Sequence, residues 1–160
     1  MGVPLLFGPK VLMVVQLLKF KMGRRKLRFV MTDSEKYLPI KEVLVKGRFE
    51  CENIVDGFNG LSISVRDYEG DYYNLHWDGG VVSYRNTDEG DRVCFVSEIA
   101  SLSLIGLLLV ECVNSKYIKW LHAEKCGIEQ ENLRHFIVMT SNDIIDVIDY
   151  DVPVVSKMNS

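Results

Sequence analysis

The sequence has few of the residues, and none of the short motifs, that usually mark an enzyme. Its three histidines do not follow the spacing of a helical zinc site, and no serine stands in a G-x-S-x-G context. No glycine-rich phosphate-binding loop is present. We therefore expect no cofactor and no bound metal. Zinc held by three ligands far apart in the sequence is the open alternative.

Cysteine pairs are also missing. The four cysteines are scattered, without a C-x-x-C motif, and each has apolar or strand-like neighbours. This pattern is typical of reduced core or boundary residues in a reducing compartment, so we expect a cytoplasmic protein without disulfides. The residues concerned are Cys51, Cys94, Cys112 and Cys126.

Acidic residues are absent from residues 1–32, which carry seven of the 19 basic residues. The remaining 12 bases face all 22 acids, which gives the rest of the chain a net charge of −10. A field of this sign attracts cationic partners and repels nucleic acid. We therefore expect the acidic body to bind neither DNA nor RNA.

The first thirty residues contain no long apolar segment. The apolar run at residues 11–18 has eight residues, whereas a membrane-spanning helix needs about 20. One interpretation is that residues 9–28 form a basic segment that makes weak contact with an anionic membrane surface. The other, which the change in composition at Thr32 and Asp33 favours, is that residues 1–30 are an upstream extension and that the natural start is Met31. Residues 31–160 then form a single α+β domain.

The body is rich in short alternating segments. In residues 61–67, apolar and polar side chains alternate strictly, which predicts a half-buried antiparallel strand. Further strands are expected at 92–96, 107–113 and 135–139, and helices at 34–38, 115–124 and 143–148. Strands that precede helices indicate the α+β class, with a single curved antiparallel β-meander sheet and helices packed on one face.

The stretch NLHWDGGVVSYRN, residues 74–86, places reactive side-chain types around a Gly-Gly pair. A two-residue turn there predicts a hairpin in which Trp77 and Tyr84 share one face. His76 and Arg85 then lie on the opposite face. These side chains do not converge as a catalytic set would have to.

Acidic residues gather near predicted turns and in residues 143–151. The three-residue spacing of Asp143, Asp146 and Asp149 would place them on one face of a helix. Carboxylates beside aromatic side chains make effective protein-binding anchors. The predicted partner-binding set is Trp77, Tyr84, Asp88, Glu89, Asp91, Asp143 and Asp146.

Three segments also carry a family resemblance: SYRNTDEGD at residues 83–91, SKYIKWLH at 115–122 and HFIVMTSNDIIDVI at 135–148. Over residues 41–155 the chain resembles small bacterial proteins, some of which look like immunity proteins that neutralise polymorphic toxins. The resemblance implies an intracellular, non-enzymatic role, and it identifies no site residues.

Two functional hypotheses follow. The first is a bacterial protein-binding module, an immunity-type inhibitor whose acidic surface covers the cationic site of a basic toxin or nuclease. The second is a small enzyme or ligand-binding domain, with a pocket on the sheet lined by His76, Arg85 and His135. The missing catalytic motifs favour the first.

Overall fold

A computed structural model describes residues 34–128 and 130–158. The predictions made for residues 1–30 lie outside the described residues. The strands of the described part are β1 (Lys36–Pro39), β2 (Phe49–Gly57), β3 (Gly60–Asp67), β4 (Tyr72–Asp78), β5 (Ser83–Asp88), β6 (Leu109–Val113), β7 (Arg134–Met139), β8 (Asp143–Asp149) and β9 (Val154–Met158). The helices are the 3₁₀ helix η1 (Glu89–Arg92), α2 (Val93–Ser101) and α3 (Lys116–Glu124).

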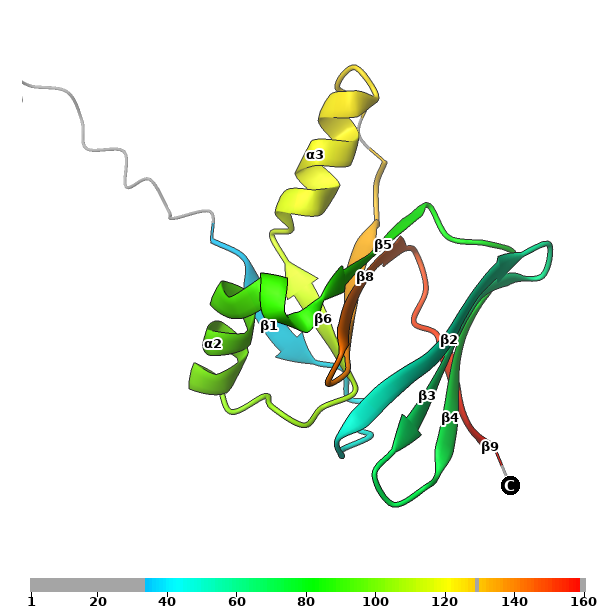
Figure 1. The fold of residues 1–160 in the computed structure, drawn as a ribbon. Helices are drawn as coiled ribbons and strands as arrows, with labels where there is room; N and C mark the ends of the chain where they lie inside the picture. The colour runs from blue at the N-terminus through cyan, green and yellow to red at the C-terminus, as the bar shows by residue number, and fades with distance from the viewer. Residues whose placement is uncertain (1–33, 129, 159–160) are drawn as a thin grey trace, which may run out of the picture. The chain divides into compact units, whose positions relative to one another are not determined.

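The strands form two sheets in which every pairing is antiparallel (Figure 1). One sheet has five strands in the order β1-β6-β7-β8-β5, and the other has four in the order β2-β3-β4-β9. The predicted α+β class and antiparallel pairing are confirmed. The strands are divided between two sheets, where the sequence pattern suggested one continuous meander.

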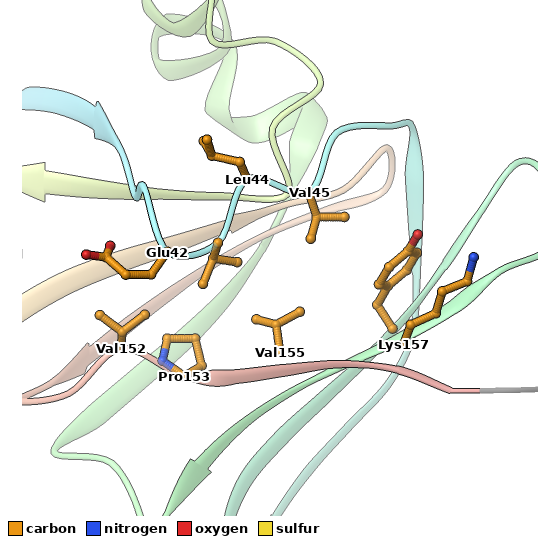
Figure 2. Close-up of a pocket in the computed structure, with 9 residues that line it drawn as sticks. Glu42, Leu44, Val45, Val152, Pro153, Val155 and Lys157 are labelled. Atoms are coloured by element: carbon orange, nitrogen blue, oxygen red, sulfur yellow. The ribbon is translucent and has the colours of Figure 1, made fainter.

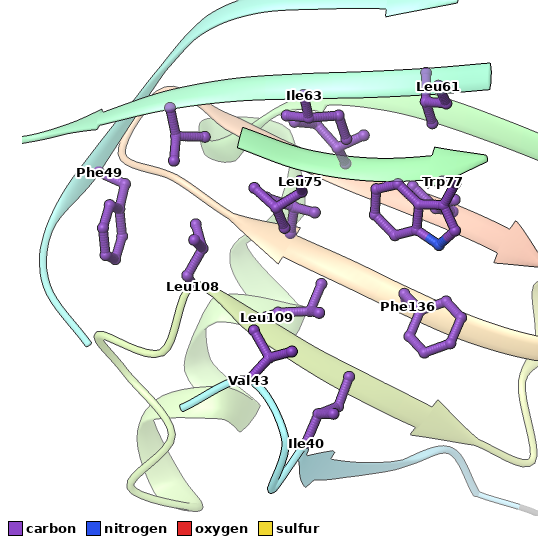
Figure 3. Close-up of a cluster of buried hydrophobic side chains, with 14 residues drawn as sticks. Ile40, Val43, Phe49, Leu61, Ile63, Leu75, Trp77, Leu108, Leu109 and Phe136 are labelled. Carbon is purple, nitrogen blue, oxygen red and sulfur yellow. The ribbon is translucent and has the colours of Figure 1, made fainter. Parts of the chain in front are cut away.

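The main hydrophobic core lies between the two sheets. It joins Leu61 and Leu75 of the four-stranded sheet to Phe136 and Val147 of the five-stranded sheet, and Figure 3 shows these layers facing each other. Strict alternation along β3 supplies this core with Leu61, Ile63 and Val65, as the sequence predicted. A second cluster on the other face of the five-stranded sheet packs Phe95 and Ile99 of α2 against the strands.

The predicted hairpin at residues 74–86 is wrong. β4 pairs with β3 and β9, whereas β5 pairs with β8 in the other sheet. Between them Gly79 and Gly80 both have positive φ, at 72° and 93°, a conformation that glycine adopts without strain. The Gly-Gly pair therefore directs the chain from one sheet to the other.

Three further assignments are corrected. Residues 34–38 were expected to be helical but contain strand β1, and residues 92–96 were expected to be a strand but form the end of η1 and the start of α2. Residues 143–148 form the buried strand β8 instead of a helix. Strand β8 lies between β7 and β5 in the sheet, and its apolar residues are buried on both faces: Ile145 and Val147 belong to the core between the sheets, and Ile144 to the cluster around α2.

Other local predictions are confirmed. Ser115 accepts a hydrogen bond from the Ile118 amide at 3.1 Å and so caps α3, and Gly127 follows the helix with a φ of 80°. All four cysteines are free, but Cys94 and Cys126 are exposed and so are not core residues. Within the described residues, no helix is both long enough and apolar enough to cross a membrane.

Candidate functional site

The most polar part of the protein interior is centred on Asp146 of β8, whose side chain is fully buried. Arg92 Nη1 donates to Asp146 Oδ2 at 2.6 Å, and Arg85 Nε donates to the same oxygen at 2.8 Å. His135 Nε2 lies 2.8 Å from Oδ1. A buried charge requires such partners, because an unpaired carboxylate in this position would be strongly destabilising.

The register of the five-stranded sheet explains this convergence. Arg85 is the cross-strand partner of Asp146, and Asp146 is also paired with Ile137. His135 lies two residues before Ile137, so its side chain is on the same face of the sheet. Arg92 reaches this face from η1, which immediately follows β5.

The pKa of Asp146 reflects this environment. Burial by itself raises the pKa of a carboxyl group, but here hydrogen bonds from His135, Arg92 and Arg85 outweigh it and hold the pKa well below its ordinary value. Asp146 is therefore ionised, and its Oδ1 can accept the Nε2 proton of His135. In the neutral imidazole with this tautomer, the other ring nitrogen, Nδ1, carries the lone pair.

That lone pair lies 2.8 Å from Ser115 Oγ. Ser115, His135 and Asp146 therefore form a hydrogen-bonded chain that resembles a serine hydrolase relay. Two features argue against nucleophilic chemistry: Ser115 is only 4% exposed, and its oxygen already caps α3. In addition, two arginines share the carboxylate that would have to stabilise a charged imidazole. The Ser115–His135–Asp146 hydrogen bonds therefore have a structural role.

A cavity of about 430 Å³ lies beside these hydrogen-bonded residues. It is bordered by Arg85, Arg92, Glu35, Tyr117 and Trp120, among others. The guanidinium of Arg85 lies 4.3 Å from the centre of the Tyr117 ring, and Tyr117 stacks on Trp120. These contacts fix the direction of Arg85, although its side chain is 48% exposed.

Three possible metal ligands meet at His135, the middle member of this hydrogen-bonded set. Glu35, Cys112 and His135 each offer one donor atom, and the three atoms lie within 4.8 Å of one another. Burial, with the nearby charge of Glu35, raises the pKa of the Cys112 thiol to about 12. A second group, Asp67, Glu69 and Asp71, occupies the turn between β3 and β4. Two of its three carboxylates already have local partners, since Asp67 accepts from two turn amides and Asp71 pairs with Lys157.

The predicted pocket residues are only partly brought together. Arg85 and His135 meet through Asp146, but His76 lies on β4 in the other sheet, where its Nδ1 is 2.8 Å from Ser62 Oγ. Arg92, Ser115 and Tyr117 also belong to this site, and none of them was predicted to do so from the sequence. In the sequence, Arg92 was notable only as part of the charged segment 88–92. Its position near Asp146 could have been predicted only if this segment had been recognised as helical.

The residues of the predicted partner-binding set fall into two groups, two that are buried and five that are not. Trp77 is 2% exposed and Asp146 is fully buried, so neither side chain can contact a partner, and both assignments are wrong. Trp77 belongs to the core between the sheets, and Asp146 neutralises two arginines. The remaining members are Tyr84, Asp88, Glu89, Asp91 and Asp143.

The four acids of this group lie at one end of β5, and Tyr84 lies four residues before Asp88 on the same strand. Asp88 and Asp143 are cross-strand partners, and Asn86 Nδ2 donates to Asp143 Oδ1 at 2.7 Å. Glu89 and Asp91 follow directly in η1. We call Tyr84, Asp88, Glu89, Asp91 and Asp143 the β5 acidic surface.

A separate cavity of about 480 Å³ lies beside β9 (Figure 2). Its wall is mainly apolar, with Val45 and Val155, and Lys157 stands at its margin. Lys157 is already paired with Asp71. None of the residues predicted from the sequence to form a site lines this cavity.

Comparisons with protein-family models, with curated proteins and with solved structures find no match for this chain.

Proposed function

We propose that the protein is a non-enzymatic binding module that holds an extended, basic segment of another protein along β5. The observation that supports this most strongly is the position of β5 at an edge of the five-stranded sheet. In the described part of the chain, β5 pairs with β8 alone, so its outer edge has backbone groups available for a further strand.

The side chains of β5 are suited to such a role. All six of its residues are exposed or half-buried, and Tyr84 is 36% exposed. Tyrosine at an interface contributes a large contact area at a low entropic cost. An added strand would therefore gain backbone hydrogen bonds from the edge and side-chain contacts from Tyr84.

Charge indicates the chemistry of the partner. Within residues 34–128 and 130–158, no ion pair involves Asp88, Glu89 or Asp91. Both arginines of this segment, Arg85 and Arg92, are instead bound to Asp146. The acidic charge at the end of β5 is thus available to a partner, and a lysine- or arginine-rich segment complements it.

An immunity-type inhibitor is the role that fits this chemistry. Toxins that act on nucleic acid carry basic active sites, because they must bind phosphates. A protein that presents carboxylates beside a free strand edge can cover such a site, and charge complementarity raises the association rate. The partner would then be a basic toxin or nuclease.

Site-specific photo-cross-linking in the native host tests the proposal. A photoreactive phenylalanine analogue at Tyr84 is expected to capture a basic protein, whereas the same analogue at Tyr150 is not. Tyr150 is a matched control because it is a tyrosine of similar exposure, 41%, between β8 and β9. Cross-linking at both positions alike, or at neither, would contradict the proposal.

Charge reversal provides the quantitative test on the captured partner. Asp88 Oδ1 accepts from the Gly90 amide and caps η1, so the test leaves Asp88 in place. Changing Glu89 and Asp91 to lysine is expected to raise Kd by about 5–30-fold at low salt, by roughly 0.5–1 kcal/mol for each charge. The control is a double lysine variant of the exposed residues Glu69 and Glu124, which changes the net charge equally. Equal losses of affinity in the two variants would show that only overall charge matters.

A further inference from the structure

We propose that Glu35, Cys112 and His135 form a zinc-binding site. Their donor atoms lie within 4.8 Å of one another, although the residues come from the segment before β1, from β6 and from β7. This site goes beyond the β5 proposal and does not depend on it. It corresponds to the alternative left open by the sequence, zinc held by ligands far apart in the chain.

The three donors match the preferences of zinc. Carboxylate oxygen, thiolate sulfur and imidazole nitrogen are its usual protein ligands, and sulfur excludes the hard cations Mg²⁺ and Ca²⁺ as the natural occupants. Two of the three ligands are buried, since Cys112 is 3% and His135 is 2% exposed. An ion held there is shielded from competing water on the side of the sheet.

His135 is oriented as a metal-binding histidine usually is. Such histidines donate their second N–H to a carboxylate, which fixes the tautomer and the direction of the ring. Here Nε2 lies 2.8 Å from Oδ1 of Asp146, and a proton donated from Nε2 to that carboxylate leaves Nδ1 of the neutral imidazole to bind a metal. Arg85 and Arg92 hold Asp146 in place from the other side.

The remaining coordination position and the route of entry are also present. Three protein ligands leave one position of a tetrahedral set for a water. Ser115 Oγ lies 2.8 Å from Nδ1 of His135, on the side where the ion would bind. Glu35 borders the cavity of about 430 Å³, so the ion has a path from solvent. On binding, zinc takes the place of the Ser115 contact to Nδ1 and of one contact between Glu35 and Lys116.

Metal titration of the full chain tests the site directly. Zn²⁺ is expected to bind with one-to-one stoichiometry in calorimetry and to raise Tm. Co²⁺, as a spectroscopic substitute, is expected to give a thiolate charge-transfer band. Cys112→Ser should abolish that band and weaken zinc binding by at least about 10-fold, because replacing even an outer partner of a ligand costs 10–100-fold.

Two further variants keep the test decisive. Glu35→Gln alters a partly exposed ligand without emptying the core, and it should also weaken zinc binding by about 10-fold or more. Cys126→Ser removes an exposed thiol outside the site and its entry cavity, and it should leave binding and the cobalt band unchanged. The proposal is overturned if the native chain binds no zinc, or if Cys112→Ser and Glu35→Gln bind it as tightly as Cys126→Ser does.

Discussion

Asp146 Oδ1 lies 2.8 Å from His135 Nε2, and the two side chains are 0% and 2% exposed. This buried pair connects most of the polar interior, because Asp146 also binds two arginines and His135 also meets Ser115. The hydrogen bonds of Asp146 therefore link the five-stranded sheet through residues that are 11 to 61 positions apart in the chain.

The first prediction concerns the carboxylate itself. Asp146→Asn keeps the size of the side chain but leaves Arg85 and Arg92 without their counter-charge. Loss of one member of a buried charge network should lower the free energy of unfolding by about 3–5 kcal/mol. Urea denaturation of the native protein and of the variant measures this difference in the free energy of unfolding. Asp143→Asn, on the same strand but with one partly exposed hydrogen bond, should cost less than about 1.5 kcal/mol.

The second prediction follows from the lowered pKa of Asp146. A carboxyl group whose folded pKa is depressed stabilises the protein fully above its unfolded pKa, which is near 3.8, and this contribution is lost as the pH falls below that value. The difference in stability between the native protein and Asp146→Asn should therefore be constant above about pH 5 and should narrow below pH 4. Denaturation curves at pH 3 and pH 7 compare the two proteins, and a difference that widens in acid would contradict the assignment.

These two predictions depend on a site that the sequence could reveal only in part. The pocket hypothesis grouped Arg85 with His135, and the two side chains do meet through Asp146. Strand alternation, which is a local property of the chain, had grouped Arg85 with His76, which lies in the other sheet. The position of Asp146 was not predicted, since the regular spacing of three aspartates favours a helix when periodicity is considered alone. Only pairing with β5 and β7, both distant in sequence, makes this segment a buried strand with a neutralised charge.

The hairpin prediction failed for a similar reason. Turn chemistry at Asp78 and Gly79 indicates a reversal of the chain but not which strands lie beside it afterwards. The alternation within β4 was predicted correctly, with Leu75 and Trp77 buried and His76 on the other face. The assignment of β5 to a second sheet depends on its pairing with β8, which starts 55 residues after the end of β5 and whose own type was misjudged.

The third prediction separates a structural role of Ser115 from a catalytic one. Ser115→Ala removes the cap of α3 at a cost of about 1 kcal/mol and leaves Nδ1 of His135 unsatisfied, which adds about 1–2 kcal/mol. Ser97→Ala, at an exposed position in α2, should change stability by less than about 0.5 kcal/mol. A fluorophosphonate probe for active serines should not label Ser115 in the native protein, whereas labelling would indicate an accessible nucleophile.

The last prediction uses two glycines at opposite ends of one turn. Gly57 and Gly60 are cross-strand partners that flank the turn between β2 and β3. Gly60 has a φ of 115°, and a Cβ built there would lie 1.9 Å from the carbonyl oxygen of Trp77. The same atom at Gly57 meets nothing within 4 Å.

Alanine at these two positions should therefore have very different effects. Gly60→Ala is expected to destabilise the protein by more than about 3 kcal/mol, because a positive φ costs about 1–3 kcal/mol by itself and the backbone of β4 must also move. Gly57→Ala should change stability by no more than about 1 kcal/mol in either direction. Chemical denaturation of both variants measures the contrast. Similar losses would mean that the turn does not rest against β4. A large loss at Gly60 alone would show that the end of β4, from which the chain crosses to β5, is held by this close approach of two backbones.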